Sequence, residues 1–344
     1  MPQDAILVLV SARTPSPDDR IAVVLPSYNE GRHVGDVVAT LPPWVWRVYI
    51  VDDASTDDTP SLVAPLVSER VHYLRHDDNR GVGGAMRTGY DAAIADGAEI
   101  VVKMDADGQM SPDDLGNIVA PILLGMAEYV KGNRFRVVRQ TSGMPTHRRF
   151  GNVAMSLANK VASGYWHVFD PQCGYTAISR NALLGLDLSR ISRDYFFEND
   201  MLAWLNTTGA RVVDVPVATL YGDEVSHIKL SRVVTTFPVR LLNRYVRRVI
   251  LRHIVWDFGA VGLLLGVGTL SFLFGALFGA YHWWLSVATD RVASTGTVMI
   301  AVLPTILGFQ MLLQALLIEV GDSPGAAETR EFMRYLARRN PADE

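Results

Sequence analysis

The sequence predicts an α/β fold: a mostly parallel, helix-covered sheet, followed by amphipathic juxtamembrane helices and two C-terminal transmembrane helices. Three observations predict it. Short β-branched runs alternate with helical patterns between Ile21 and Val217, a rhythm typical of a parallel sheet. A basic segment with interleaved apolar residues follows. Two long uncharged stretches lie in the C-terminal part of the chain, and each is long enough to cross a bilayer as a helix.

Composition narrows the class of protein. The chain has 344 residues, with 32 basic and 36 acidic side chains and a net charge of −4. No basic excess is available to bind a phosphate backbone, so we expect no nucleic-acid partner. A single cysteine excludes an internal disulfide and a multi-cysteine zinc site. The mean hydropathy of +0.15 is high for a chain with 20% charged residues, which indicates an unusually apolar segment.

The expected elements alternate regularly along the soluble region. Ser111 and Pro112 are a good helix start, because serine caps a helix and proline suits its first position. The expected strands are Ile21–Leu25, Val48–Asp52, Val71–Leu74, Ile100–Met104, Tyr129–Gly132, Thr176–Ser179 and Val212–Val215. The expected helices include Gly31–Leu41, Gly83–Asp96, Pro112–Leu124, Phe150–Ser163 and Glu198–Thr207.

Two stretches near the C-terminus are expected to span a membrane. Residues 258–280 carry no charge over a length of about 35 Å as a helix. Residues 297–318 are also uncharged, although Pro304 indicates a kink. A buried helical hairpin in a soluble protein is the alternative. The connector 281–296 contains two tryptophans that suit a membrane interface.

A basic segment precedes the first span. Residues 229–256 hold seven Lys or Arg and no acid, so we expect amphipathic helices, broken near Pro238, that lie on lipid headgroups. A solvated charged face is the alternative. Ala5–Val10 is too short and follows an acid, so no signal peptide is expected. By the positive-inside rule we expect a multi-pass protein of the cytoplasmic membrane, with its large domain on the cytoplasmic side.

The expected organisation has five parts. These are an N-terminal extension (1–19), an α/β domain (20–228), amphipathic basic interfacial helices (229–257), a two-helix transmembrane domain (258–320) and a cytoplasmic tail (321–344). Homo-oligomerisation through the membrane helices is also expected.

Polar residues follow three of the expected strands. The sequence reads LPSYNE at 25–30, VDDASTD at 51–57 and KMDADGQ at 103–109. Ligands of open α/β sheets bind beyond the carboxyl ends of the strands. We therefore expect these three segments to form a binding site together.

These segments, with NRGVGGAMRTG at 79–89, resemble the family-two glycosyltransferases of the GT-A (Rossmann-like) fold. The resemblance covers about residues 20–225. KGNRF at 131–135, DPQCGYTAIS at 170–179 and the C-terminal helix pair are similar to the polyprenol-phosphate glycosyltransferases, such as dolichyl-phosphate mannose synthases and undecaprenyl-phosphate glucosyltransferases. The resemblance implies a nucleotide diphosphate sugar as donor and a polyprenol phosphate as acceptor.

A nucleoside pocket is expected at the first two strand ends. The resemblance places Pro26, Tyr28 and Glu30 in its lining. A carboxylate of Asp52 or Asp53 can accept a hydrogen bond from a base N–H or a ribose hydroxyl. We expect one of the pair to cap the following loop and assign Asp53 to the base, with the reverse assignment left open.

A divalent cation, Mg²⁺ or Mn²⁺, is expected at the fourth strand end. Asp105 and Asp107 lie two residues apart and point the same way in extended backbone, and the carbonyl of Gln109 can complete an oxygen-ligand set. Such a cation neutralises charge on a leaving diphosphate. Ala106 lies between the two carboxylates and is assigned to the donor pocket. A solvated turn is the alternative.

The glycine-rich segment opens a helix. Backbone N–H groups from Gly81 to Gly84 can meet the donor diphosphate there. Close packing of the helix on the sheet is the alternative, because the G-x-G-x-x-G spacing of dinucleotide sites is missing.

A second anion site is expected near Arg134. The resemblance assigns the lipid phosphate to the arginines at 134 and 148, with Asn152 one turn later, and arginine suits this because it binds phosphate bidentately. Arg149 is expected to be a surface charge.

Glu198 and Asp200 resemble the acidic stretch near the reacting centre. A phosphate acceptor is already ionised and needs no general base, so we assign both residues to positioning, with a capped helix start as the alternative. Ser226 and Lys229 are also assigned to the substrate pocket. The segment around them departs from the G-x-S-K pattern of mannose synthases, which disfavours GDP-mannose.

The expected function is therefore inverting, metal-dependent transfer of a hexose, from UDP-glucose or a related UDP-sugar, to polyprenol phosphate on the cytoplasmic leaflet. A GDP-mannose-dependent synthase is one alternative. A membrane-tethered nucleotide-binding scaffold without turnover is another. A polymerising synthase is disfavoured because Q-x-x-R-W is missing, and a sugar-nucleotide pyrophosphorylase because its glycine-rich first loop is missing.

Overall fold

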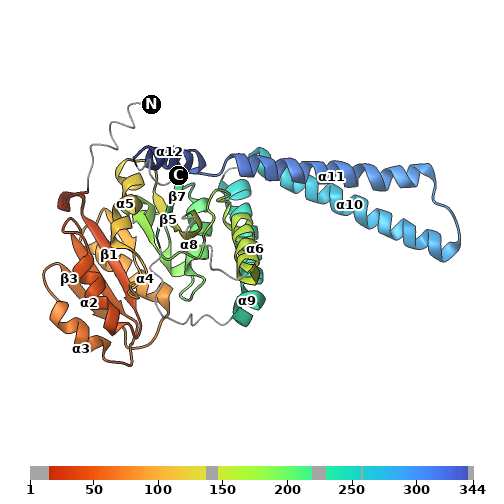
Figure 1. Cartoon of the computed structure of the whole chain (residues 1–344). Coiled ribbons are helices and arrows are strands. Elements are labelled where there is room, and N and C mark those ends of the chain that lie inside the picture. Colours follow the sequence, from red (N-terminus) through yellow and green to blue (C-terminus); the bar gives the residue numbers. More distant parts are fainter. Residues whose placement is uncertain (1–14, 137–145, 219–229, 257–258, 340–344) are drawn as a thin grey trace. The chain divides into compact units, whose positions relative to one another are not determined.

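The computed structural model describes residues 15–136, 146–218, 230–256 and 259–339 (Figure 1), without the side chains of 146–154, 230–235 and 338–339. The chain forms two compact units. The first comprises residues up to Tyr245 together with those from Pro324 onward, and the second comprises Val246–Ser323.

A seven-stranded mixed sheet is the centre of the first unit. Its strand order is β3-β2-β1-β4-β6-β5-β7, and only β6 runs antiparallel to its neighbours. The predicted α/β class with a mostly parallel sheet is confirmed. The strands are β1 (Ile21–Ser27), β2 (Arg47–Asp52), β3 (Val71–Arg75), β4 (Ile100–Lys103), β5 (Tyr129–Asn133), β6 (Thr176–Ser179) and β7 (Val212–Pro216).

Helices lie between the strands along the chain, and in the described part of the chain four further α-helices follow the last strand. They are α2 (Gly31–Thr40), α3 (Thr59–Val63), α4 (Val82–Ala95), α5 (Leu115–Leu123), α6 (Thr146–Ser163), α7 (Arg180–Leu184), α8 (Phe197–Thr207), α9 (Leu230–Ile250), α10 (Ala260–Thr289), α11 (Thr295–Gly321) and α12 (Ala326–Arg339). Short 3₁₀ turns are Pro17–Asp19, Ala64–Leu66, Pro112–Asp114, Arg134–Arg136 and Leu188–Arg190, and Leu251–Trp256 is π-helical.

The strands are apolar because both faces of the sheet are covered. Ile21 to Leu25 of β1 are fully buried, as is Ile50 of β2. Continuous apolar runs of this kind are typical of parallel strands between two helical layers. In β1 and β2 the buried polar residues Ser27 and Asp52 therefore follow the apolar run, at the carboxyl end of each strand.

Two local predictions turned out differently in detail. Ser111 caps as expected, because its hydroxyl accepts the N–H of Asp113 at 3.3 Å, but a 3₁₀ turn precedes the α-helix that begins at Leu115. The predicted break near Pro238 does not occur, since α9 continues through it.

The C-terminal segment differs from the tail we expected. Helix α12 packs on β7, and Phe332 is buried in the main core. Two hydrogen bonds hold this segment on β7: Val212 N–H donates to the backbone oxygen of Pro324 at 3.3 Å, and Asp214 N–H donates to the side-chain Oγ1 of Thr329 at 3.2 Å. The chain therefore returns to the first unit after α11 (Figure 1).

The second unit contains two long apolar helices. α10 and α11 pack against each other along their length and are long and apolar enough to cross a membrane (Figure 1). Only 22% and 11% of their most apolar windows are buried. A core helix of a soluble protein is mostly buried, so the membrane interpretation is favoured over a soluble hairpin. α10 extends beyond the predicted span, to Thr289.

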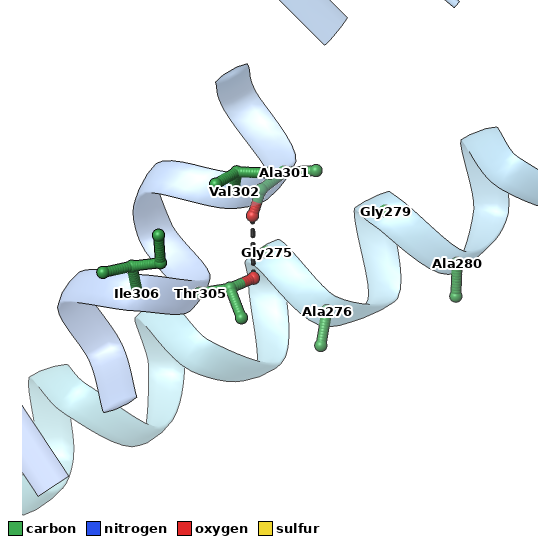
Figure 2. A pocket seen from close by; sticks show the side chains of 8 residues that line it. All are labelled: Gly275, Ala276, Gly279, Ala280, Ala301, Val302, Thr305 and Ile306. Carbon is green, nitrogen blue, oxygen red and sulfur yellow. Dashed lines mark hydrogen bonds between the residues drawn. The ribbon is translucent and has the colours of Figure 1, made fainter. Parts of the chain in front are cut away.

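Small residues bring the two helices close. A side chain at Gly275 would lie 2.6 Å from the carbonyl oxygen of Ala301 and from the nitrogen of Thr305. Figure 2 shows this crossing, where the Thr305 hydroxyl donates to Ala301 O at 2.7 Å. The hydroxyl is thereby satisfied within its own helix, as polar groups in an apolar medium require.

A buried ion pair lies in the same unit. Arg248, which we expected on lipid headgroups, is 1% exposed and pairs with Glu319 of α11. The sequence did not predict this pair, because Glu319 is distant from Arg248 along the chain.

Candidate active site

The carboxyl ends of β1 and β2 form one continuous edge. Ser27 and Asp52 are direct neighbours across the two strands. Beyond them the loops are joined: Asn29 N–H donates to Ser55 Oγ at 2.9 Å, and Thr56 N–H donates to Asn29 Oδ1 at 2.9 Å. The two segments predicted to form the nucleoside pocket therefore lie together.

Side chains of the first loop differ in accessibility. Tyr28 is 46% exposed, so its ring is open to a ligand. Pro26 and Glu30 are half-buried, and Glu30 immediately precedes α2. This loop thus offers an exposed aromatic face at the strand edge, where a base can stack.

Both aspartates at the end of β2 are buried and engaged internally. Asp52 accepts from Ser55 N–H at 2.8 Å and from the Tyr73 hydroxyl at 2.5 Å. Asp53 accepts from the N–H groups of Arg80 and Gly81 at 2.8 and 2.7 Å. We expected only one of the pair to hold a loop, but both do, and the base contact of Asp53 stays a prediction.

The glycine-rich segment turned out differently from the predicted diphosphate contact. Gly81 N–H is used by Asp53. Gly83 and Gly84 N–H both donate to the carbonyl of Arg193, at 2.8 and 3.3 Å. A side chain at Gly81 would lie 2.5 Å from that same carbonyl oxygen. These contacts favour the alternative of close packing, because the amides already have protein acceptors.

The predicted cation ligands lie on the turn after β4. Asp107 Oδ1 accepts from Gln109 N–H at 2.9 Å, and Gly108 between them has a φ of +74°. Asp105 and Asp107 are half-buried, whereas Ala106 is buried. Among the described residues no group of three His, Cys, Asp or Glu side chains is arranged to hold a metal.

This donor set fits a hard cation that is shared with a substrate. Mg²⁺ is commonly held by one or two carboxylates, with phosphates and water completing the octahedron. Asp105 and Asp107 supply that number of carboxylates at a half-open edge. A cation bound here would therefore depend on the diphosphate for part of its coordination.

A buried lysine, which the sequence analysis did not identify, pairs with Asp105. Lys103 Nζ lies 2.6 Å from Asp105 Oδ1 and 3.2 Å from Glu198 Oε1. Burial alone would lower the pKa of Lys103, but the two carboxylates outweigh it and raise that pKa above its ordinary value. The ammonium is thus a fixed positive charge between two predicted site residues. A lone lysine at the end of the apolar run IVVK is the signal that could have found it.

The loop 170–174 lies next to the carboxylate of Asp105 and the amino group of Lys103. A side chain at Gly174 would lie 2.6 Å from Lys103 Nζ. Lys131, fully buried on β5, donates to Cys173 O at 2.5 Å, and burial lowers its pKa. Two buried lysine side chains, Lys103 and Lys131, therefore lie next to this loop.

Arg134 is held by that loop. Its Nε and Nη2 donate to the two carboxylate oxygens of Asp170, at 2.7 and 3.0 Å. Asp170 is buried, whereas the Arg134 side chain is 38% exposed. A bidentate pair fixes the orientation of a guanidinium. Asp170 was also missed at the sequence level, because its partner lies 36 positions earlier.

The remaining predicted residues are only partly described. Arg148 and Asn152 lie in the N-terminal half of α6, as does Arg149, but their side chains are outside the described part of the chain. Ser226 and Lys229 lie outside the described residues. Their roles stay predictions.

The two acids of α8 have separate surroundings. Glu198 meets Lys103 at the sheet edge. Asp200 is fully buried and accepts from Ser192 N–H and Oγ at 2.8 and 2.6 Å. It also pairs with Arg244 of α9. Glu198 therefore belongs to the cluster around Asp105, whereas the contacts of Asp200 are with Ser192 and Arg244.

The chain is similar to known glycosyltransferases. Residues 22–185 match the glycosyl transferase family 2. A UDP-N-acetylglucosamine–dolichyl-phosphate N-acetylglucosaminyltransferase from Methanococcus voltae is 31% identical over 221 residues, which are 60% of this chain and 88% of that protein.

Two further relatives act on related lipids by name. A polyprenol monophosphomannose synthase from Mycolicibacterium smegmatis is 29% identical, over 63% of this chain and 83% of its own. An undecaprenyl-phosphate mannosyltransferase from Micrococcus luteus is 30% identical, over 62% of this chain and 88% of its own.

Proposed function

Because this chain belongs to glycosyl transferase family 2 and to its polyprenol-phosphate type, we propose that it transfers one hexose from a nucleoside diphosphate sugar to a membrane polyprenol phosphate. The observation that supports the proposal is that Asp105 and Arg134 both contact the loop 170–174. Loop 170–174 touches both: Gly174 approaches Asp105, and Asp170 holds Arg134. A carboxylate suited to a metal–diphosphate and a guanidinium suited to a phosphate thereby share one loop.

The reaction has a simple balance of bonds. An oxygen of the lipid phosphate attacks the anomeric carbon, and the bond from that carbon to the diphosphate oxygen breaks. The nucleoside diphosphate leaves with the electron pair. Attack from the face opposite the leaving group inverts the anomeric centre.

The residues of this chain would bind and orient the two anions. Tyr28 would stack on the base, and Arg134 would hold the lipid phosphate. The phosphate is already ionised at neutral pH, so no residue has to remove a proton from it. Glu198, tied to Lys103 at 3.2 Å, would position sugar hydroxyls. A divalent cation held by Asp105 and Asp107 would neutralise charge on the departing diphosphate.

The donor is proposed to be a UDP-sugar, with UDP-glucose as the first candidate. A UDP-sugar stands in the name of the Methanococcus voltae relative. A mannosyl donor is the second candidate, because the other two relatives carry mannose in their names. The departure from G-x-S-K near Ser226 supports the first candidate.

The proposed leaflet follows from the path of the chain. The chain leaves the first unit after Tyr245 and returns to it at Pro324. If α10 and α11 both span, the two ends of this hairpin lie on one side of the membrane. The basic residues before α10 place that side in the cytoplasm by the positive-inside rule.

The test is incubation of the purified protein with undecaprenyl phosphate, Mg²⁺ and a panel of UDP- and GDP-sugars, with mass spectrometry of the lipid. One sugar added to the lipid phosphate supports the proposal and identifies the donor. Donor hydrolysis with an unchanged lipid would refute it.

A further inference from the structure

Helix α9 is part of the catalytic unit up to Tyr245. Phe237 and Leu241 are buried against Phe196, and the rings of Phe237 and Phe196 meet edge to face at 5.1 Å. The outer side of the helix carries Val239 and Leu242, which are 68% and 63% exposed. One side of α9 is therefore docked on the domain, and the other presents apolar side chains.

An ion pair at the docked side reaches the interior. Arg244 Nη2 donates to Asp200 Oδ2 at 3.1 Å, and Asp200 is fully buried. The same oxygen accepts from Ser192 N–H and Oγ. Arg240, one turn earlier, pairs with the exposed Asp194 at 2.8 Å. The buried pair is the stronger constraint, because exposed ion pairs contribute little.

The segment held by Asp200 packs directly on the glycines that precede and open α4. Arg193 O accepts from Gly83 N–H and Gly84 N–H. A side chain at Gly83 would lie 2.9 Å from Arg193 Cα. Backbone therefore rests on backbone here, and a shift of residues 192–193 must shift residues 83–84.

The glycine segment is held on its other side by the nucleoside pocket. Asp53 accepts from Arg80 N–H, Gly81 N–H and the ring of His76, at 2.7 to 2.8 Å. A path of hydrogen bonds, linked by two short stretches of backbone (192–193 and 81–83), thus joins α9 to the end of β2. All residues on this path belong to the described part of the chain.

We propose that α9 is a positioning element of the donor pocket: the Arg244–Asp200 ion pair, acting through Ser192 and Arg193, fixes the glycine segment and thereby sets the affinity for the nucleotide. This inference rests on the proposed function. It makes the helix that leads into the membrane hairpin a determinant of donor binding, and Arg244 a positioning residue instead of the headgroup contact expected from the sequence.

The first test measures hydrogen exchange in the full-length protein. Arg244→Gln should accelerate exchange at the amides of Gly83 and Gly84, while the amides of β1 keep their protection. Asp200→Asn should do the same without leaving a buried carboxylate unpaired. Arg244→Lys, which keeps the charge, should restore most of the protection. The matched control is Arg190→Gln, which removes an exposed arginine from the same loop region.

The second test measures binding of UDP and of GDP, each with Mg²⁺. Arg244→Gln and Asp200→Asn should each raise the Kd of the bound nucleotide by roughly 3- to 30-fold. In the double variant, the increase in nucleotide Kd should be smaller than the product of the two single increases, because both substitutions break the same ion pair. The KM for a short, water-soluble prenyl phosphate should stay as in the wild type.

Two results would overturn the inference. One is exchange at Gly83 and Gly84 that is equal in Arg244→Gln, Asp200→Asn and the Arg190→Gln control. The other is an unchanged nucleotide Kd with a raised KM for the lipid alone. A wild-type protein that binds neither nucleotide would refute the proposed function as well, whereas the exchange result concerns the coupling alone.

Discussion

The ammonium of Lys103 lies 2.6 Å from Oδ1 of Asp105, beneath the edge where the predicted cation would bind. The same ammonium is 3.2 Å from Glu198. A buried charge is costly unless it is paired. Lys103 therefore balances two carboxylates before any substrate arrives, and it fixes the oxygen of Asp105 that faces inward.

Lys103→Met should destabilise the protein by roughly 3 to 5 kcal/mol, since it leaves two carboxylates without their partner. Thermal unfolding in detergent measures the loss. Adding Glu198→Gln to this variant should recover part of the stability, because one unpaired charge is then removed. A single variant as stable as the wild type would show that the pair contributes nothing.

Asp107→Ala should abolish transfer while the unfolding temperature stays near that of the wild type. The side chain is half-buried at a turn, so little packing is lost. Activity should also disappear in excess EDTA and return with Mg²⁺ or Mn²⁺. Full activity in EDTA would refute the cation site.

Arg134→Ala should raise the KM for the lipid acceptor by roughly 10- to 150-fold, equivalent to about 1.5 to 3 kcal/mol for a charge-assisted phosphate contact. Steady-state kinetics with each substrate varied separately measures this. Asp170→Asn should give a smaller effect in the same direction, because it loosens the guanidinium without removing it. If Arg134→Ala weakened only nucleotide binding, the positions of the two substrates would have to be exchanged.

His167 makes stability depend on pH. Burial lowers its pKa to about 4, and its Nε2 lies 2.8 Å from Val212 O. The unfolded chain binds a proton near pH 6.5 and the folded chain does not, so the contribution of this group is complete above about pH 6.5 and is lost as the pH falls toward 4. The loss should be on the order of 3 kcal/mol.

The control for that prediction is His167→Gln, which keeps a donor for the carbonyl and has no titration. Its unfolding temperature should fall less than that of the wild type between pH 7 and pH 4.5. Parallel decline of the two proteins would contradict the role of His167.

The sequence predicted those parts of the fold that depend on residues close together in the sequence. The apolar runs predicted the seven strands of the sheet, and the Ser111-Pro112 pair predicted the start of a helix with serine as its cap. The polar residues after β1 and β2 lie together as predicted, and those after β4 leave the same edge, because parallel strands end at one edge. Each of these inferences needs only neighbouring residues or the rule of a parallel sheet.

The parts that were missed depend on partners far away in the sequence. Arg244 pairs with Asp200, which is 44 positions earlier in the sequence. Because no acid is near Arg244 in the sequence, the basic run predicted a surface for lipid headgroups instead. Phe332 enters the core from a segment that is polar on average. The amides of Gly83 and Gly84 meet a carbonyl of residue 193, and a backbone acceptor has no sequence signal.

We propose a lipid phosphate as the acceptor, and a comparison of undecaprenyl phosphate with undecaprenol itself tests whether the phosphate is needed. Purified wild-type protein and Asp107→Ala are each incubated with the donor sugar nucleotide and Mg²⁺, and the lipids are analysed by mass spectrometry. We predict that the wild type adds one sugar to the phosphorylated lipid and none to the alcohol, and that the variant adds none to either. Equal transfer to the alcohol, or an unmodified lipid phosphate while the donor is consumed, would contradict the account.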